Sequence, residues 1–148
     1  QAEERGRQVI GYLSSRAEKL GCKVDLYNHG DWFGQPANQI RIIESLPGYD
    51  LGLVYNFHHA HDQLDDFSEN VDRMLPHLRY VNINGMRREG PKILPVGRGN
   101  LERELIEELL VKGYQGPFGL LGHVENADVE VILKENIRGF FGMNLQTN

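Results

Sequence analysis

Short apolar runs that alternate with amphipathic stretches constrain the fold of this 148-residue chain more than any other feature. The apolar runs predict strands at residues 22–30, 50–57, 79–85 and 117–124. The amphipathic stretches repeat apolar residues at helical spacing and predict helices at residues 2–20, 38–46, 62–78, 101–112 and 127–141. Strands and helices that alternate across short links favour parallel strands with right-handed crossovers. We therefore predict one α/β domain that covers residues 1–148.

The composition is that of a globular protein and excludes several classes of partner. Hydrophobic residues make up 40% of the chain and charged residues 25%, which is typical of a folded domain. The net charge is −5 and there is no basic stripe, so we expect no nucleic-acid partner. Cys22 is the only cysteine, so neither an internal disulfide nor a cysteine-based metal site can form.

Targeting signals are equally sparse. No stretch of about 18 apolar residues could span a bilayer, so we expect no membrane partner. The first residues, QAEERGR, lack the apolar segment of a signal peptide. Because the chain begins with Gln1 rather than Met, we expect a processed or truncated start. The compartment, cytoplasmic or exported, is left open.

Polar side chains follow every predicted strand. Ligands of parallel α/β sheets bind at the carboxyl ends of the strands, so we expect these side chains to face one shared site. They are Asn28, His29, Asp31 and Trp32 after the first strand, Asn56, His58, His59, His61 and Asp62 after the second, Asn82, Asn84, Arg87, Arg88 and Lys92 after the third, and His123, Glu125 and Asn126 after the fourth.

Imidazole dominates this set, since three of the six histidines lie in VYNFHHAHDQLDDF at residues 54–67. Imidazole suits transition-metal binding and acid/base chemistry near neutral pH. Serine catalysis has no support, because the serines fall in predicted helices or turns away from the strand ends.

Some residues also have plainer interpretations. His59 would point away from His58 along an extended chain, so we expect it to be an ordinary loop residue. Trp32 either packs its loop or stacks on a sugar. His77 ends a predicted helix, where a surface role fits. The GRG turn at 97–99 precedes a helix whose N-terminus could hold an anion, although a lone G-x-G is a weak signal.

Four motifs, LYNHGDWFGQPANQI, VYNFHHAHD, NINGMRREGPKILPVGRGN and GYQGPFGLLGH, together resemble the sugar phosphate isomerase/epimerase family of xylose-isomerase-like TIM barrels. The resemblance covers nearly all of the chain but only the second, C-terminal half of such a barrel. It implies a fold of about four (β/α) units preceded by a helix. Because half a barrel leaves sheet edges open, we expect either a missing half-barrel or a second copy as partner.

The resemblance also implies a divalent metal held by Glu, Asp, His and Glu on four strands. By position these ligands would fall on Tyr27, Tyr55, Asn82 and Gly122, none of which is a family ligand type. His58 matches the histidine that follows the family's aspartate motif, and Arg88 matches a substrate-contacting arginine. A relocated site remains open, in which manganese, zinc, magnesium or cobalt would be held by His29, His58, His61 and His123.

The resulting hypothesis is an isomerase- or epimerase-like protein that moves a proton next to the carbonyl of a small-molecule carbohydrate. Its catalytic residues would be His29, His58 and His123, and its substrate-binding residues Trp32, Asn82, Asn84, Arg88 and Lys92. Two alternatives stay open. One is a lyase or hydrolase that acts on oxidised sugars, and the other is a non-catalytic sugar-binding or scaffold protein.

Overall fold

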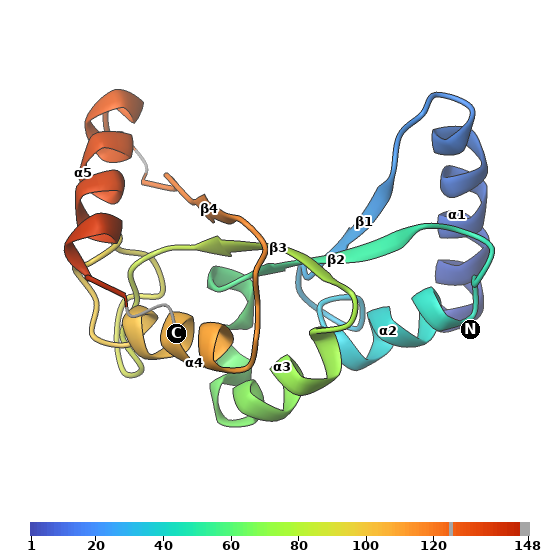
Figure 1. The fold of residues 1–148 in the computed structure, drawn as a ribbon, viewed down its shortest axis with the longest axis horizontal. Coiled ribbons are helices and arrows are strands. Elements are labelled where there is room, and N and C mark those ends of the chain that lie inside the picture. Colours follow the sequence, from blue (N-terminus) through green and yellow to red (C-terminus); the bar gives the residue numbers. More distant parts are fainter. Residues whose placement is uncertain (125, 146–148) are drawn as a thin grey trace.

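The predicted alternation of helices and strands is confirmed by a computed structural model, which describes residues 1–124 and 126–145 (Figure 1). The elements are α1 (Ala2–Glu18), β1 (Val24–Tyr27), α2 (Pro36–Glu44), β2 (Leu51–Asn56), the 3-10 helix η1 (His58–Asp66), α3 (Phe67–Met74), β3 (Leu78–Ile83), α4 (Glu102–Val111), β4 (Phe118–Leu120) and α5 (Val129–Gly142). No helix of the described chain has both the length and the apolar character needed to cross a membrane.

Within the described residues, four strands form one parallel sheet in the order β1-β2-β3-β4. Figure 1 shows the helices as an arc around one side of this curved sheet, with α1 at one end of the arc and α5 at the other. The opposite, concave side of the sheet carries no helix in the part of the chain described. This is the α/β architecture predicted from the sequence.

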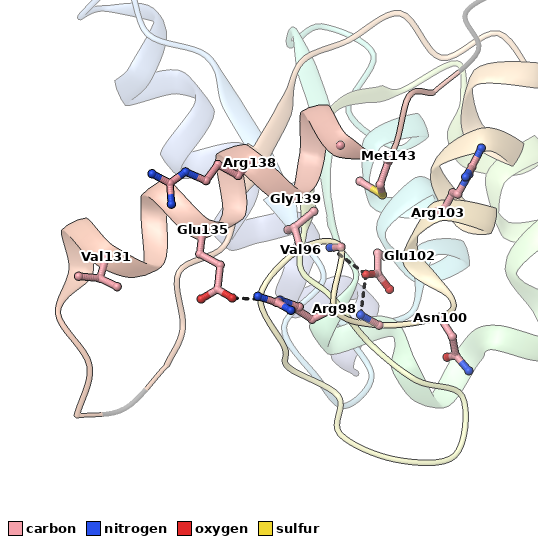
Figure 2. A pocket seen from close by; sticks show the side chains of 13 residues that line it. Val96, Arg98, Asn100, Glu102, Arg103, Val131, Glu135, Arg138, Gly139 and Met143 are labelled. Carbon is pink, nitrogen blue, oxygen red and sulfur yellow. Dashed lines mark hydrogen bonds and ion pairs between the residues drawn. The ribbon is translucent and has the colours of Figure 1, made fainter.

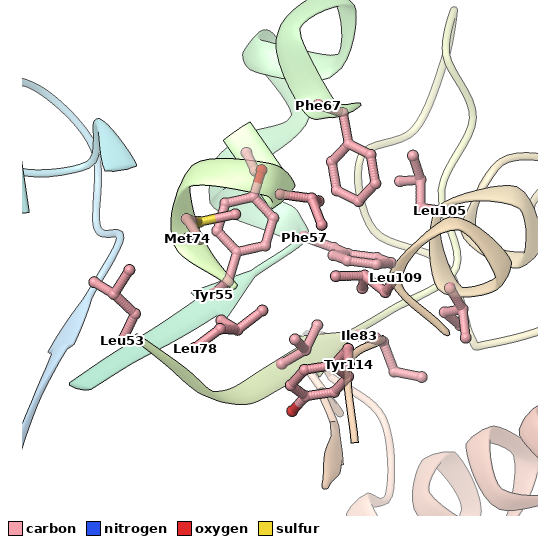
Figure 3. Close-up of a cluster of buried hydrophobic side chains, with 14 of the residues drawn as sticks. Leu53, Tyr55, Phe57, Phe67, Met74, Leu78, Ile83, Leu105, Leu109 and Tyr114 are labelled. Carbon is pink, nitrogen blue, oxygen red and sulfur yellow. The ribbon is translucent and has the colours of Figure 1, made fainter. Parts of the chain in front are cut away.

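The core lies between the sheet and the helical arc (Figure 3). Tyr55 and Phe57 at the end of β2 meet Phe67 of α3, with ring centroids 6.0–6.4 Å apart. Leu105 and Leu109 of α4 close the same cluster. Burial of each such side chain contributes about 1.5–3 kcal/mol, so this layer stabilises the packing of the helices on the sheet.

The concave side is polar near the start of the strands. Arg79 forms ion pairs with Asp25 (2.8 Å) and with Asp50, and its side chain runs across Gly52. A Cβ at Gly52 would lie 2.6 Å from Arg79 Cδ, so only glycine leaves room for this crossing. The register between β2 and β3 is irregular next to Leu53, one residue beyond Gly52.

The helix predicted over residues 62–78 is wrong at both ends. Residues 58–66 form the 3-10 helix η1, and the non-helical backbone of Gln63 interrupts it (φ −121°, ψ 19°). α3 ends at Met74, and Leu78 already begins β3. Pro76 lacks an N–H to continue the helical hydrogen bonds, which explains the early stop.

Candidate functional site

All strands of a parallel sheet have their carboxyl ends on the same side of the sheet, and the histidines gather there. His29 lies 4.4 Å from His59, His59 lies 4.7 Å from His58, and His58 lies 6.0 Å from His123, measured between ring centroids. We call these four side chains the imidazole row. It extends from the end of β1 to the segment after β4, so residues almost 100 positions apart meet at the carboxyl end of the sheet. We call this end of the sheet the mouth.

His59 belongs to this row, which corrects the expectation that it would point away. The expectation assumed an extended chain after β2, in which neighbouring side chains alternate. Residues 58–66 instead wind into a 3-10 helix, so His58 and His59 fan out on the same side. Tyr27 approaches the edge of the His59 ring at a centroid distance of 5.6 Å.

Two buried asparagines hold the end of β2 in place. Asn28 Nδ2 donates to Asn56 O (3.1 Å), and Asn28 Oδ1 accepts from Asn56 N (2.7 Å). The Asn28 amide therefore takes the place of strand backbone where β1 has ended. The Asn56 side chain accepts from His58 N (2.9 Å) and donates to the hydroxyl of Tyr27. This chain of hydrogen bonds positions His58 and Tyr27 relative to each other.

Asn56, rather than Tyr55, points toward the mouth, which corrects one position assigned by resemblance. Tyr55 is 1% exposed and packs between the sheet and α3. Its hydroxyl has no hydrogen-bond partner among the described residues, and burial raises the pKa of Tyr55 well above its ordinary value. Side chains alternate along a strand, so an assignment shifted by one residue selects the wrong face.

The row disfavours protonation of its central members. Burial lowers the pKa of His58 below 6.5, and the charges of His123, Lys92, His29 and His61 lower it further. Burial also lowers the pKa of His59, followed by the charges of His58, His29 and His123. A neutral imidazole at neutral pH can accept a proton, so these side chains suit general-base chemistry.

A cavity of about 460 Å³ opens beside the row, between the loop after β1 and η1. Its walls include Trp32, Gln35, Asn38, His59, Asp62 and Gln63. This volume falls within the roughly 300–1,000 Å³ of small-molecule sites. Trp32 also packs against the hydrophobic core, so it serves the loop packing and presents a wall to the cavity as well.

The loop after β3 brings positive charge toward this side of the sheet. Arg88 pairs with Asp65 (3.1 Å) and Lys92 with Asp62 (2.7 Å), and both carboxylates lie on η1. Asn82 is partly buried, with its Oδ1 close over Gly119 of β4.

Asn84 does not fit the substrate-binding role expected for it, because it is fully buried. Its Nδ2 donates to Gly85 O (2.9 Å) and to Lys92 O (2.7 Å). Asn84 therefore organises the loop. Glu125, which the sequence places after the fourth strand, lies outside the described residues.

Three solved structures share this architecture. One is 3-keto-D-glucoside 4-epimerase from E. coli, with a TM-score of 0.68, 17% identity, and coverage of 93% of this chain and 51% of that one. The second is a xylose isomerase-like TIM barrel protein from Mycobacterium smegmatis in complex with magnesium, with a TM-score of 0.64, 22% identity, and coverage of 96% of this chain and 49% of that one. The third is a D-tagatose 3-epimerase-like protein, with a TM-score of 0.64, 21% identity, and coverage of 92% of this chain and 54% of that one.

The chain has the fold of half a xylose isomerase-like TIM barrel. It spans about half the length of the structures it matches. No known protein family and no curated protein matches it by sequence. Identities of 17–22% show a shared fold only. Any conclusion about chemistry must therefore come from the residues of this chain.

Those residues do not fit the metal that the resemblance implies. No group of three or more His, Cys, Asp or Glu side chains could hold an ion within residues 1–124 and 126–145. His61 faces the loop, where its Nε2 donates to Arg87 O (2.7 Å), so that nitrogen is not free to bind a metal. His29, His58 and His123 lie as rings in a row that His59 completes.

Glu102 organises the long loop of the half-barrel and was missed by sequence reasoning. Its carboxylate is 2% exposed and accepts from the backbone N–H groups of Met86 (3.2 Å), Gly97 (3.0 Å) and Gly99 (2.9 Å). The amides of Gly97 and Gly99 are thus occupied by a carboxylate, so the GRG turn does not offer them to an external anion.

A second cavity, of about 710 Å³, lies between the GRG turn and α5 (Figure 2). Arg98 pairs with Glu135 across it (3.1 Å), while Arg103 and Arg138 point in different directions. The arginines do not converge, so this cavity is a less suitable ligand site than the one beside Trp32.

Proposed function

We propose that the chain is the C-terminal half of a carbohydrate-active TIM barrel that transfers a proton at the carbon next to a sugar carbonyl. The imidazole row at the strand ends carries this proposal. His29, His58, His59 and His123 meet within 4.4–6.0 Å of their neighbours. His59 also lines a cavity large enough for a sugar. The similarity of the fold to a keto-sugar epimerase supports the substrate class.

His58 is the proposed base. Its lowered pKa keeps the ring neutral near pH 7, and a neutral ring nitrogen takes the proton from the carbon next to the carbonyl. The electron pair of the broken C–H bond moves into an enolate. Return of a proton from His123 or His29 to the opposite face of that carbon gives the epimer.

The remaining predicted residues would bind the substrate. Trp32 offers an aromatic wall against which an apolar sugar face can stack. Arg88 and Lys92 would bring positive charge to the enolate oxygen, after leaving their carboxylate partners on η1. Asn82 would donate to a hydroxyl. The catalytic mouth would be completed by a missing half-barrel or by a second copy.

A lyase that acts on oxidised sugars is the second candidate. The positions that match the family's metal ligands hold Tyr27, Asn82 and Gly122, and none of these is a carboxylate or an imidazole. Removal of a proton next to a ketone needs only a base, and the resulting enolate can expel a leaving group instead of being reprotonated. The first step is then the same as in epimerisation, and the products differ.

Solvent-deuterium exchange into a 3-keto-glucoside, followed by NMR, tests the proposal on the complete polypeptide. We expect exchange at the carbon next to the ketone and a loss of about 100-fold or more in His58→Asn, since acid/base groups contribute 10²–10⁴-fold. His77→Asn is the matched control, because His77 lies at the start of β3, at the opposite end of the sheet.

The products separate the candidates. An intact sugar with inverted configuration indicates an epimerase, and release of the aglycone with an unsaturated sugar indicates a lyase. Sugar binding without any exchange would contradict the proposed chemistry and favour the non-catalytic alternative. Equal exchange rates in His58→Asn and the native protein would remove the imidazole row as the reacting centre.

A further inference from the structure

The hydroxyl of Tyr27 receives a hydrogen bond whose direction is fixed by backbone groups. Asn56 N donates to Asn28 Oδ1 (2.7 Å), and His58 N donates to Asn56 Oδ1 (2.9 Å). A backbone N–H can only donate, so the atom that it meets on each side-chain amide must be the oxygen. The Asn56 amide therefore turns its Nδ2 toward Tyr27 and donates to the hydroxyl oxygen.

The proton of the Tyr27 hydroxyl is left for another acceptor. A phenol hydroxyl can accept one hydrogen bond and donate another, and Asn56 uses only the accepting side. Within residues 1–124 and 126–145, the hydrogen bond from Asn56 is the single one that this hydroxyl makes. An O–H group that accepts a hydrogen bond is polarised by it and becomes a stronger donor. Tyr27 thus offers a strengthened, unused donor.

This donor lies at the mouth, on the concave side of the sheet. Leu26, the preceding residue of β1, is 2% exposed and belongs to the core. Neighbouring side chains of a strand point to opposite faces, so Tyr27 points away from the helical layer. Its ring centroid lies 6.3 Å from that of His29 and 5.6 Å from that of His59. Two members of the imidazole row therefore border the Tyr27 ring.

One buried amide connects Tyr27 to the proposed base. Asn56 is fully buried, and it holds the backbone of His58 through Oδ1 and the hydroxyl of Tyr27 through Nδ2. When a proton leaves the carbon next to a carbonyl, negative charge develops on an oxygen only two bonds from that carbon. A base and a donor for this oxygen must therefore lie close together, and the Asn56 amide keeps His58 and Tyr27 in that relation.

We propose that Tyr27 is a catalytic residue that donates a hydrogen bond to the substrate's carbonyl oxygen as this becomes an enolate oxygen. The inference rests on the proposed function, because the charge develops only if a proton leaves the neighbouring carbon. His58 takes that proton, the electron pair of the C–H bond forms the carbon–carbon double bond, and the π pair of the carbonyl moves to the oxygen. Tyr27 keeps its own proton and shares it with the oxygen, so no further reactant is needed.

Tyr27 differs in one respect from the cations that are proposed for the same oxygen. Arg88 and Lys92 are paired with carboxylates on η1 and would have to leave them first. The Tyr27 hydroxyl breaks no described contact when it donates to a substrate. Donors that are already oriented toward a developing charge cost no reorganisation during the reaction. Tyr27 therefore supplies a directed hydrogen bond, and the two cations add charge after the loop has moved.

Tyr27→Phe in the complete polypeptide tests this role, because it keeps the ring and removes only the hydroxyl. Solvent-deuterium exchange into a 3-keto-glucoside should lose about 100-fold or more in kcat, since one oxyanion donor contributes roughly 10²–10³-fold. KM should change little, because the charge is present in the transition state and not in the bound ketone. Tyr12→Phe is the matched control, since Tyr12 lies on α1 and is 65% exposed. We expect it to keep the native rate.

Asn56→Asp separates hydrogen-bond donation from a packing role. The carboxylate still accepts from His58 N, but it places a second acceptor where Nδ2 now donates to Tyr27. The Tyr27 O–H then turns toward residue 56 and away from the substrate. In this background we expect Tyr27→Phe to slow the exchange little further, because the donor is already withdrawn. Slowing by the same factor in both backgrounds would assign Tyr27 to packing and overturn the proposal.

The kinetic results separate this role from the proposed function. Exchange in the native protein that continues undiminished in Tyr27→Phe would overturn the role of Tyr27 and leave His58 as the base. A raised KM with unchanged kcat would show that Tyr27 only binds the substrate, which also overturns the role. No exchange in the native protein would overturn the proposed chemistry, and the role of Tyr27 with it.

Discussion

Glu102 connects separate parts of the loop that carries Arg88 and Lys92. One carboxylate oxygen accepts from Gly97 N and Gly99 N, and the other accepts from Met86 N. A buried carboxylate with three backbone donors is well compensated for its lost hydration. The loop can therefore hold one conformation over the mouth without help from a substrate.

Replacing this carboxylate should loosen the loop. Glu102→Gln puts an amide nitrogen, which cannot accept, where an oxygen now accepts from the backbone. We expect the free energy of unfolding to fall by about 1–3 kcal/mol, the cost of unsatisfied buried hydrogen-bonding groups. Urea unfolding measures it, with Glu104→Gln as the control because Glu104 is exposed in the first turn of the same helix. Equal midpoints for the two variants would contradict this role.

Single residues were the hardest feature to predict from the sequence. The position of His58 at a strand end follows from the length of the apolar run before it. Whether Tyr55 or Asn56 faces the mouth depends on the register of one residue, and the run LVYN does not reveal the register. His59 joins the row because the chain turns immediately after β2, and this turn has no proline or glycine to mark it.

At the scale of elements, α5 and the GRG turn meet through two glycines. A Cβ at Gly139 would lie 1.7 Å from Val96 O, and a Cβ at Gly97 would lie 2.9 Å from Gly139 Cα. Asn136 strengthens the contact by accepting from Val96 N (2.7 Å) and donating to Leu121 O (3.3 Å). The last helix is thus attached to the loop and to the end of β4 by the same short stretch.

Gly139→Ala should force α5 away from the turn. The new Cβ meets backbone, which cannot swing aside as a side chain could, so we expect a loss of about 1–3 kcal/mol in the free energy of unfolding. Gly142→Ala is the matched control, because nothing lies within 4 Å of its Cβ. Alanine there should stabilise the helix by about 0.5–1 kcal/mol. Thermal unfolding compares the two, and a neutral Gly139→Ala would show that the contact is dispensable.

Helices and strands were the most predictable level. β2 and α4 follow from the period of their apolar residues, and the parallel order follows from their alternation. The segment between β2 and α3 was the exception. Leu64 continues the apolar spacing of α3 backward, so the pattern predicts one long helix, whereas the backbone of Gln63 breaks it. Periodicity alone does not distinguish a 3-10 turn from the first turn of a helix.

At the scale of the whole molecule, the half-barrel separates its charges. The ion pairs of Arg79 occupy the concave face at the start of the strands, and the imidazoles occupy the other end. The sequence predicted that the polar residues after the strands meet, because the carboxyl ends of parallel strands lie on the same side of the sheet.

The meeting of the histidines also gives the molecule a pH response. His58 and His59 have pKa values below 6.5 in the folded chain, so the unfolded chain binds more protons as the pH falls through this range. Stability contributed by these groups is present above pH 6.5 and is lost as the pH falls through the folded pKa values.

An NMR titration of the histidine rings tests most directly whether the strand ends form one cluster. We predict that His58 and His59 titrate below pH 6.5 in the folded protein, and at their ordinary pKa in urea. We also predict that His123→Asn raises the pKa of His58, because the charge of His123 is the largest cause of its lowering after burial. Titration of His58 at its ordinary pKa, unchanged by His123→Asn, would contradict the imidazole row.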